Sequence, residues 1–449
     1  MKMKNLVYKL IVCVTLISGI TGFQIIGQST GSKDQIAIPS DSLLLNKVLQ
    51  IVISSHPSVK EAEEAITIAD AKVGIAKSGY LPNVDASASY SRIGPVPTID
   101  FPGLGSFQLY PADNYSAAVN YSQALYDFGK TRQNVGYEKE NKILAEKNVA
   151  LLKQGLSLRT AGAFYNLAYF QEAIKIKEEE IQAYKEHLAI VEKQKATGSA
   201  TQNDLLKVKV KLSVTESSKT DLETRRKMQV YILKSLMNHP LTALLMVKLD
   251  AFNAPISMVQ DSLFSFAFSH RMELDIAKEK EVIANLQLNV AKAQDNPVLN
   301  VFASGGGKNG YIPDLNVVKL NYAVGVGLRV PLFNGNRTKN NELIAKSLIN
   351  NSQYDSELAK RSITTDVIEC ETVIESAAQQ IVQGQVQLRQ AEEAFTLAKV
   401  KFASGSMTNL DLLDAENDVS NSRLMLLKSK IDYAVGVFKL NIALGNKMY

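Results

Sequence analysis

Apolar and polar positions alternate in four short stretches of the chain. The alternation is strongest over residues 115–125 and 321–330, where nearly every second side chain is apolar and small or polar residues fill the positions between. A two-residue period over about ten residues predicts a β-strand with two unlike faces. Weaker alternation over 84–90 and 299–304 predicts two more strands. The pattern therefore predicts four strands, arranged as two pairs.

The four expected strands fit two environments. A soluble antiparallel sheet with one wet face alternates in this way, and so does a strand that crosses a membrane beside a water-filled lumen. Strands of about ten residues span a bilayer when they are tilted. Four of them cannot close a barrel, which needs about eight, and an open sheet in lipid leaves backbone groups unpaired. If these strands lie in a membrane, several chains must combine them.

Three other stretches carry a seven-residue apolar repeat. The repeating positions are Leu167, Ile174, Ile181 and Leu188, then Val367, Ile374, Ile381, Leu388, Phe395 and Phe402, and finally Leu412, Val419, Leu426, Tyr433 and Leu440. Such a repeat predicts long helices that pack as coiled coils. Residues 130–195 contain no proline and would form a helix roughly 100 Å long, with a matching helix over 338–401. Helices of this length suit a tube or a spacer.

The chain is internally duplicated. Gly198, Thr201 and Asp204 recur as Gly405, Thr408 and Asp411, each pair 207 positions apart. Similar residues also surround Gly129 and Gly335. A solenoid would show many short periods, whereas this is one long unit used twice.

Each unit reads as helix, strand, loop, strand, very long helix, glycine turn and long helix. The first helix is expected over 42–78, because Pro82 ends it. The loops 92–114 and 306–317 are expected to be exposed, the first as an irregular loop rich in proline and glycine, and Gly305–Gly307 reads as a strand end or loop. The expected segments are a signal peptide at 1–28, a first structural repeat at 29–239, a connector at 240–260 and a second structural repeat at 261–449.

The first residues predict export. Lys2, Lys4 and Lys9 precede the apolar run 10–20, which is typical of a secretory signal cleaved between positions 22 and 29. A membrane-anchoring helix is the alternative, but the run is short for a span. Of the net charge of +5, about +2 remains after removal, which argues against a nucleic-acid partner. No other stretch is long and apolar enough for a transmembrane helix, and Cys370, the only mature cysteine, cannot form an internal disulfide.

Catalytic and cofactor sites are not indicated by the sequence. Gly129-Lys130-Thr131 precedes a helix as a phosphate loop would, but Ala124 replaces the expected glycine and bulky residues lie between. The histidines show no ligand spacing, and no nucleophile–base pair is visible; they are His56, His187, His239 and His270. We therefore expect a protein that is not an enzyme and has no cofactor or metal.

Several of these motifs together resemble the outer-membrane efflux protein family, the TolC-like ducts. They are the paired Gly-x-x-Thr-x-x-Asp turns, Leu81-Pro82-Asn83 before a strand, the strand exits near 129 and 335, and the final helix ending at Gly445. The resemblance covers nearly the whole mature chain. It implies an α+β membrane protein in the outer membrane: a homotrimer with a twelve-stranded β-barrel, four strands per chain, continued by a periplasmic tunnel of helices. The connector at 240–260 would belong to an equatorial belt.

The same resemblance implies a passive export channel. Its partners would be two further copies of the chain, a periplasmic adaptor protein, an inner-membrane pump of the RND type, and outer-membrane lipid. The alternative from another class is a periplasmic coiled-coil adaptor or structural spacer, which would also have long hairpins. Such proteins lack alternating strands of bilayer length between the hairpins.

Family resemblance also implies a gate and a docking site at the glycine turns. Asp204, Asp411 and Asp414 would line the pore constriction, where a ring of carboxylates favours cations. Local helix capping by Thr201 and Thr408 is the other interpretation of these residues, and the two are compatible. The family often places an aromatic hydroxyl and a basic residue just before the Asp411–Asp414 pair, whereas this chain has Phe402 and Met407. The implied adaptor-docking residues are Gly198, Ser199, Thr201, Gly405, Ser406 and Thr408.

Overall fold

The computed structural model describes residues 44–103, 105–238 and 260–448. The expected signal peptide, and the connector apart from Gln260, lie outside the described residues. The helices are α2 (Leu45–Ser55), α3 (Pro57–Ser78), α4 (Lys130–Ala196), α5 (Gln202–Leu236), α6 (Gln260–His270), α7 (Met272–Ala293), α8 (Arg337–Ala403) and α9 (Asn409–Ala443). The strands are β1 (Asn83–Arg92), β2 (Thr98–Phe101), β3 (Gly105–Gln108), β4 (Asp113–Tyr126), β5 (Val298–Lys308) and β6 (Lys319–Arg329).

The described helices come in pairs of equal length. Helices α2 and α6 have 11 residues each, α3 and α7 have 22, α4 and α8 have 67, and α5 and α9 have 35. The offset between paired helices is 215 positions before the strands and 207 after them. The first half is thus longer in its strand region, where it carries an additional hairpin, β2–β3.

The two loop expectations hold only in part. The first loop is not irregular, because β2 and β3 pair as an antiparallel hairpin on either side of Gly103, whose φ of +87° suits glycine. Gly305–Gly307 form the end of β5, as one of the two expectations had it, and β5 stays paired with β6 as far as Lys308, so the second loop begins later than position 306. A Cβ atom at Gly306 would lie 2.0 Å from the carbonyl oxygen of Ala117. Glycine here therefore allows β5 to approach the backbone of β4 closely.

The single helix expected over 42–78 is wrong, because it breaks at His56. His56 is extended (φ −67°, ψ 129°), and Pro57 begins α3. A residue before proline avoids the helical region, and proline at the first helical position lacks only an amide that would have no helical partner. The imidazole Nδ1 of His56 accepts a hydrogen bond from the amide of Ser58 at 3.2 Å, which caps the new helix.

The four long strands form one antiparallel sheet in the order β1-β4-β5-β6. Val84 lies opposite Tyr121, which lies opposite Ala303, which lies opposite Val324. Because directly paired side chains share a face, the apolar positions of all four strands fall on one face of the sheet. This apolar sheet face is exposed in the chain, with Leu320 at 94% and Tyr322 at 86% of full exposure.

The opposite, polar sheet face carries hydroxyl, amide and charged side chains. The Oγ atoms of Ser89 and Ser116 lie 2.8 Å apart, and Asn120 donates to Asp85 at 2.9 Å. The larger apolar side chains on this face are Val298 and Phe302, and the ring of Phe302 lies against Gly325, where a Cβ atom would be 2.5 Å from it. The sheet therefore has one apolar and one polar face, as the alternation predicted.

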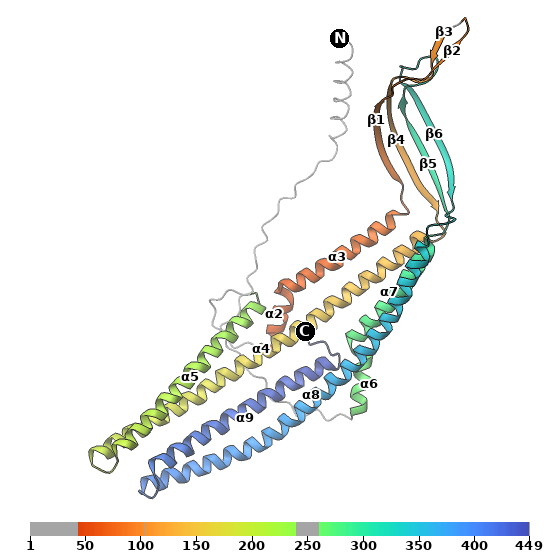
Figure 1. Ribbon diagram of the computed structural model, residues 1–449. Helices are drawn as coiled ribbons and strands as arrows, with labels where there is room; N and C mark the ends of the chain where they lie inside the picture. Colours follow the sequence, from red (N-terminus) through yellow and green to blue (C-terminus); the bar gives the residue numbers. More distant parts are fainter. Residues whose placement is uncertain (1–43, 104, 239–259, 449) are drawn as a thin grey trace, which may run out of the picture. The chain divides into compact units, whose positions relative to one another are not determined.

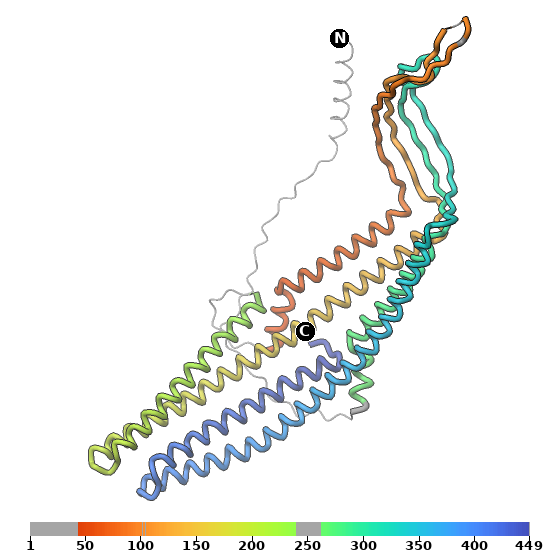
Figure 2. The backbone as a smooth tube through the Cα atoms, in the orientation of Figure 1, coloured from red at the N-terminus to blue at the C-terminus, as the bar shows by residue number. Residues whose placement is uncertain are grey.

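The helices form two antiparallel hairpins and a layer that leads to the sheet. Figures 1 and 2 show α4 beside α5 and α8 beside α9, with α3 and α7 against the halves of α4 and α8 nearest the sheet. The predicted heptad positions of α9 are all buried, from Leu412 to Leu440. The predicted positions of α4 and α8 are buried or half-buried, so all three apolar seams face the packing between the helices. None of the described helices is long and apolar enough to cross a membrane.

Arg271 joins three helices at the start of α7. Its guanidinium makes ion pairs with Glu273 at 2.8 Å and with Asp366 of α8 at 2.8 Å. It also donates to the carbonyl oxygen of Ala443, near the end of α9. The Arg271 side chain is only 8% exposed, so its charge depends on these partners.

We expect Arg271→Ala to destabilise the fold by roughly 2 kcal/mol or more, because it leaves two carboxylates and a carbonyl without their buried partner. Thermal unfolding followed by circular dichroism measures the change. Arg361→Ala is the matched control, because Arg361 is exposed on α8 and forms no ion pair with a described residue. Equal melting temperatures for the two variants would contradict this role of Arg271.

Candidate functional site

The two helical hairpins end in turns of the same geometry. Gly198 and Gly405 have φ values of +77° and +72°, which glycine adopts without strain. The amide of Ser199 donates to the carbonyl oxygen of Gln194 at 2.8 Å, and that of Ser406 donates to Lys401 at 2.8 Å. A left-handed glycine followed by this bond is a Schellman motif, which satisfies the last carbonyl groups of a helix.

A threonine caps the next helix in each turn. The Oγ1 atom of Thr201 accepts from the amide of Asp204 at 3.1 Å, and the Asp204 carboxylate accepts from the amide of Thr201 at 3.0 Å. Thr408 and Asp411 repeat the first bond at 3.2 Å. The hydrogen bonds from Thr201 hold the pKa of the Asp204 carboxyl below its usual value. Local capping by both threonines is thus confirmed.

The three candidate gate acids have different partners. Asp204 and Asp411 are bound by the threonines of their own turns. Asp414 is exposed and makes an ion pair with Lys211 of α5, with 3.1 Å between Oδ1 and Nζ. This pair joins the two hairpins. Of the three carboxylates, Asp414 therefore has its charge offset by a cation from the other hairpin.

A buried contact between His187 and Asn409, here called the His187–Asn409 node, also joins the hairpins; the sequence did not reveal it. The Nε2 atom of His187 in α4 is hydrogen-bonded to the Oδ1 atom of Asn409 in α9. The Nδ2 atom of Asn409 donates to the carbonyl oxygen of Asp204 at 3.1 Å, so Oδ1 is its acceptor and His187 donates. The ring of Phe402 meets His187 edge to face, 5.1 Å away. Burial lowers the pKa of the His187 imidazole, which favours its neutral form.

A second seam of α4 carries four polar residues that the sequence did not assign to the interior. Lys177, Glu180, Tyr184, His187 and Val191 follow alternating spacings of three and four, and all five are buried. These polar residues are not part of a seven-residue apolar repeat, so the apolar pattern of the sequence did not reveal this seam. Its spacing was visible in the sequence, but polar residues at such positions more often face solvent.

Glu180 is the centre of a buried polar cluster on this seam. Its carboxylate accepts from Lys177 at 2.6 Å, and the hydroxyl of Ser420 in α9 donates to the same oxygen. Glu416, one turn before Ser420, lines a cavity of about 270 Å³ between α4, α8 and α9. Burial raises the pKa of the Glu416 carboxyl to about 7; Lys399 opposes the rise, and Glu180 and Glu186 add to it. A neutral and a charged Glu416 therefore coexist near neutral pH.

Glu416 makes the packing of α9 sensitive to pH. Because the pKa of the folded state lies above the ordinary 4.5, its contribution to stability is present at acidic pH and lost as the pH rises through about 7. We expect Glu416→Gln to stabilise the hairpins at pH 8, by up to roughly 2 kcal/mol, and to change little at pH 5. Amide hydrogen exchange of α9 measures this.

The exposed Asp418→Asn, on the same helix, is the control for loss of one carboxylate. If both variants slow exchange equally at pH 8, or if Glu416→Gln acts equally at both pH values, burial of Glu416 is not the cause.

Comparison with known proteins identifies one family across most of the chain. The model of the "Outer membrane efflux protein" family matches residues 48–239 and 267–446. The proteases secretion protein PrtF of Dickeya chrysanthemi is 24% identical over 375 residues, which cover 80% of this chain and 79% of that protein. The outer membrane protein TolC of Vibrio cholerae is 22% identical over 376 residues, covering 82% and 83%.

Solved structures show the same fold. A structure of CusC, described as a transmembrane channel, superposes with a TM-score of 0.75 at 19% identity, covering 90% of this chain and 92% of that one. The outer membrane protein VceC of Vibrio cholerae gives a TM-score of 0.74 at 19% identity, covering 90% and 97%. In both comparisons the matched part covers nine-tenths of this chain.

Proposed function

This chain belongs to the outer membrane efflux protein family, and from that premise we propose that three copies assemble around one axis to form its pore. The family comprises transport channels rather than enzymes. The chain itself is the outer-membrane channel component of an efflux or secretion system, with its long helices on the periplasmic side. A periplasmic adaptor or spacer, the alternative raised by the sequence, does not agree with this family.

The exposed apolar face and the unpaired edges of the sheet support the proposed assembly of three copies. The apolar face is exposed on β1, β4 and β6 and mostly half-buried on β5, while β1 pairs only with β4, and β6 only with β5, among the described strands. In lipid, the unpaired edges would leave backbone donors and acceptors without partners. Joining β6 of one copy to β1 of the next satisfies both edges, and three copies give twelve strands. The apolar face then meets lipid and the polar face lines a lumen.

Two outer helices support the same assembly. Helix α5 exposes Leu206, Val210 and Val214, and α8 exposes Leu397 and Val400. In the chain, α5 packs on α4 and α8 packs on α7 and α9, so each helix has a free side. Contact between α5 of one copy and α8 of the next would cover these side chains and continue the wall below the barrel.

The two sheet faces can be distinguished by placing one charge on each. Val324 lies on the apolar face and Ala323, its neighbour, on the polar face. We expect Val324→Arg to cost about 2–4 kcal/mol of insertion free energy, and Ala323→Arg to be tolerated. The measurement is the fraction of full-length chain recovered from outer membranes as a heat-modifiable trimer. Equal recovery of both variants, or wild-type recovery as a soluble monomer, would contradict the barrel.

The hairpin turns are proposed as the gate. Asp204, Asp411 and Asp414 would narrow and charge the pore where three copies meet, and the Lys211–Asp414 pair would hold the hairpins of one copy together. The His187–Asn409 node lies in the same layer and would keep the two turns at a fixed separation. These contacts replace those that the family often builds on the positions of Phe402 and Met407.

We expect Asp411→Ala combined with Asp414→Ala to raise single-channel conductance and to weaken block by hexamminecobalt(III) by about an order of magnitude, because up to six carboxylates leave the constriction. Planar bilayer recordings measure both. Lys211→Met is a control that should have the opposite effect. It removes the cation paired with Asp414, so the block by hexamminecobalt(III) should become stronger. Wild-type conductance and block in the double variant would place these acids outside the constriction.

The proposed partners follow the same geometry. Gly198, Ser199, Thr201, Gly405, Ser406 and Thr408 form two small, nearly identical turns, which would accept the helical hairpins of a periplasmic adaptor that links the channel to an inner-membrane pump of the RND type. The repeats 29–239 and 261–449 would contribute one docking turn each. The connector at 240–260 would form part of the equatorial belt.

A further inference from the structure

The barrel strands meet the long helices at a cavity of about 550 Å³, here called the junction cavity. Helix α4 begins at Lys130 and α8 at Arg337, each after two successive residues of positive φ. These turns place the first residues of both helices next to the start of β5 and the end of β6. The cavity is lined by Lys130, Arg329 and Arg337, by Asp295, and by amide side chains that include Asn300 and Asn341.

The charge of the junction cavity is strongly unbalanced. Its three cations come from three elements, α4, β6 and α8, and none of them forms an ion pair with a carboxylate of the described residues. Asp295 is the one acid in the lining that the structure describes, and its carboxylate accepts from Asn334 at 2.7 Å. Clustered like charges repel and destabilise a fold, so an arrangement without pairing partners points to a ligand of opposite charge.

The cavity opens on the polar sheet face. Val298 lies directly opposite Arg329, and Asn300 is the next residue of β5 on that face. The apolar face at this level carries Leu299 and Leu328 instead. A ligand in the junction cavity is therefore reached from the side that would line the lumen, and it is separated from the lipid side by the sheet.

We propose that the junction cavity binds anionic groups, such as carboxylate, sulfate or phosphate, on solutes that pass along the lumen, and that it makes this stretch of the conduit prefer anions. The proposal rests on the proposed function, because it takes the polar sheet face as the lumen wall. The guanidinium groups of Arg329 and Arg337 can each bind an anion through parallel hydrogen bonds, and Lys130 adds a third positive charge. The cations remain exposed, so binding is weak enough for solutes to leave.

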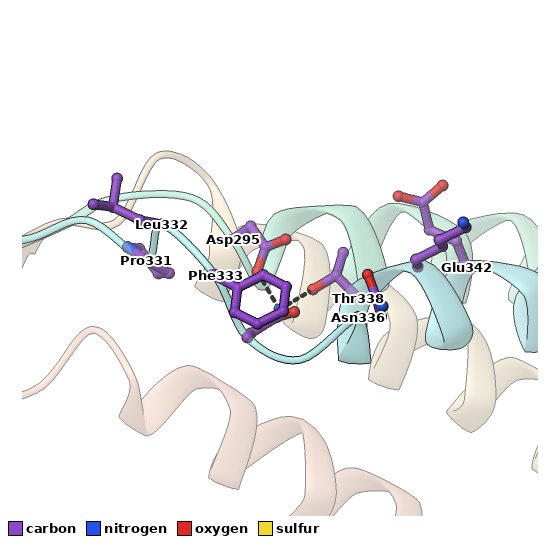
Figure 3. Close-up of a pocket in the computed structure, with 9 residues that line it drawn as sticks. Asp295, Pro331, Leu332, Phe333, Asn336, Thr338 and Glu342 are labelled. Atoms are coloured by element: carbon purple, nitrogen blue, oxygen red, sulfur yellow. Dashed lines mark hydrogen bonds between the residues drawn. The ribbon is translucent and has the colours of Figure 1, made fainter.

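A neighbouring cavity provides an internal comparison. It is drawn in Figure 3 and lined by Lys339 together with two acids, Asp295 and Glu342, and with Leu332 and Phe333. The Nδ2 atom of Asn334 bridges Asp295 and Thr338 there, at 2.7 Å to each. Its cation is outnumbered by carboxylates, so it lacks the positive excess of the junction cavity. Lys339 lies two residues from Arg337 on the same helix.

The test uses the full-length trimer in planar bilayers, with inorganic tripolyphosphate as the probe. Added to the side of the strand loops, the probe reaches the junction cavities without passing the acidic gate. We expect it to block the wild-type current, and Arg329→Gln and Arg337→Gln each to raise the blocking concentration about tenfold. The reversal potential in a potassium chloride gradient should shift toward cation preference. Lys339→Gln should leave both quantities unchanged.

Three results would overturn the proposal. If Lys339→Gln weakens the block as much as Arg337→Gln, the effect is that of total charge. If the arginine variants no longer assemble while Lys339→Gln does, the cations serve the contact between copies. Failure of the wild-type chain to form any channel would instead sink the proposed function, and a channel that conducts but resists the probe would sink the anion site alone.

Discussion

Backbone hydrogen bonding in lipid is the constraint on which the rest of the structure depends. Each strand edge placed in a bilayer must find a partner, because no water is present to replace it. The sheet β1-β4-β5-β6 satisfies this requirement internally and leaves it open at β1 and β6. The apolar face alone would be compatible with a soluble protein that docks on another surface. The open edges at the two sides of the sheet, β1 and β6, are the reason that we propose further copies of the chain.

The antiparallel order of the strands also determines where the helices begin. All four strands connect to helices at one end of the sheet, because their antiparallel order places the start of β1 and β5 beside the end of β4 and β6. Helices α3, α4, α7 and α8 therefore leave the sheet side by side. This convergence also gathers Lys130 and Arg337 beneath Arg329, although the three residues come from distant parts of the sequence. A charge cluster at the junction is thus a product of topology rather than of any local motif.

Periodicity explains what the sequence could and could not predict. The strands and the heptad seams repeat over ten residues or more, and the structure has them within a few residues of their expected bounds. The break at His56 depends on Pro57 alone, and the β2–β3 hairpin consists of two four-residue strands, so neither left a repeating signal. The contact of His187 with Asn409 joins residues 222 positions apart, which no local pattern encodes. At the tip, the sequence identified Asp204 and Asp411 with their threonines but not Lys211 or the buried Glu416.

The equal lengths of the paired helices have a consequence for how such a chain can change over generations. The two tip turns stay level because α4 matches α8 at 67 residues and α5 matches α9 at 35. A deletion confined to one helix would pull one turn out of the layer and rotate every later side chain off its seam. Insertions and deletions should therefore survive only in multiples of seven and in four helices at once. Natural relatives whose long helices differ in length would then differ by whole heptads, and the same number of heptads would be gained or lost in both halves of the chain.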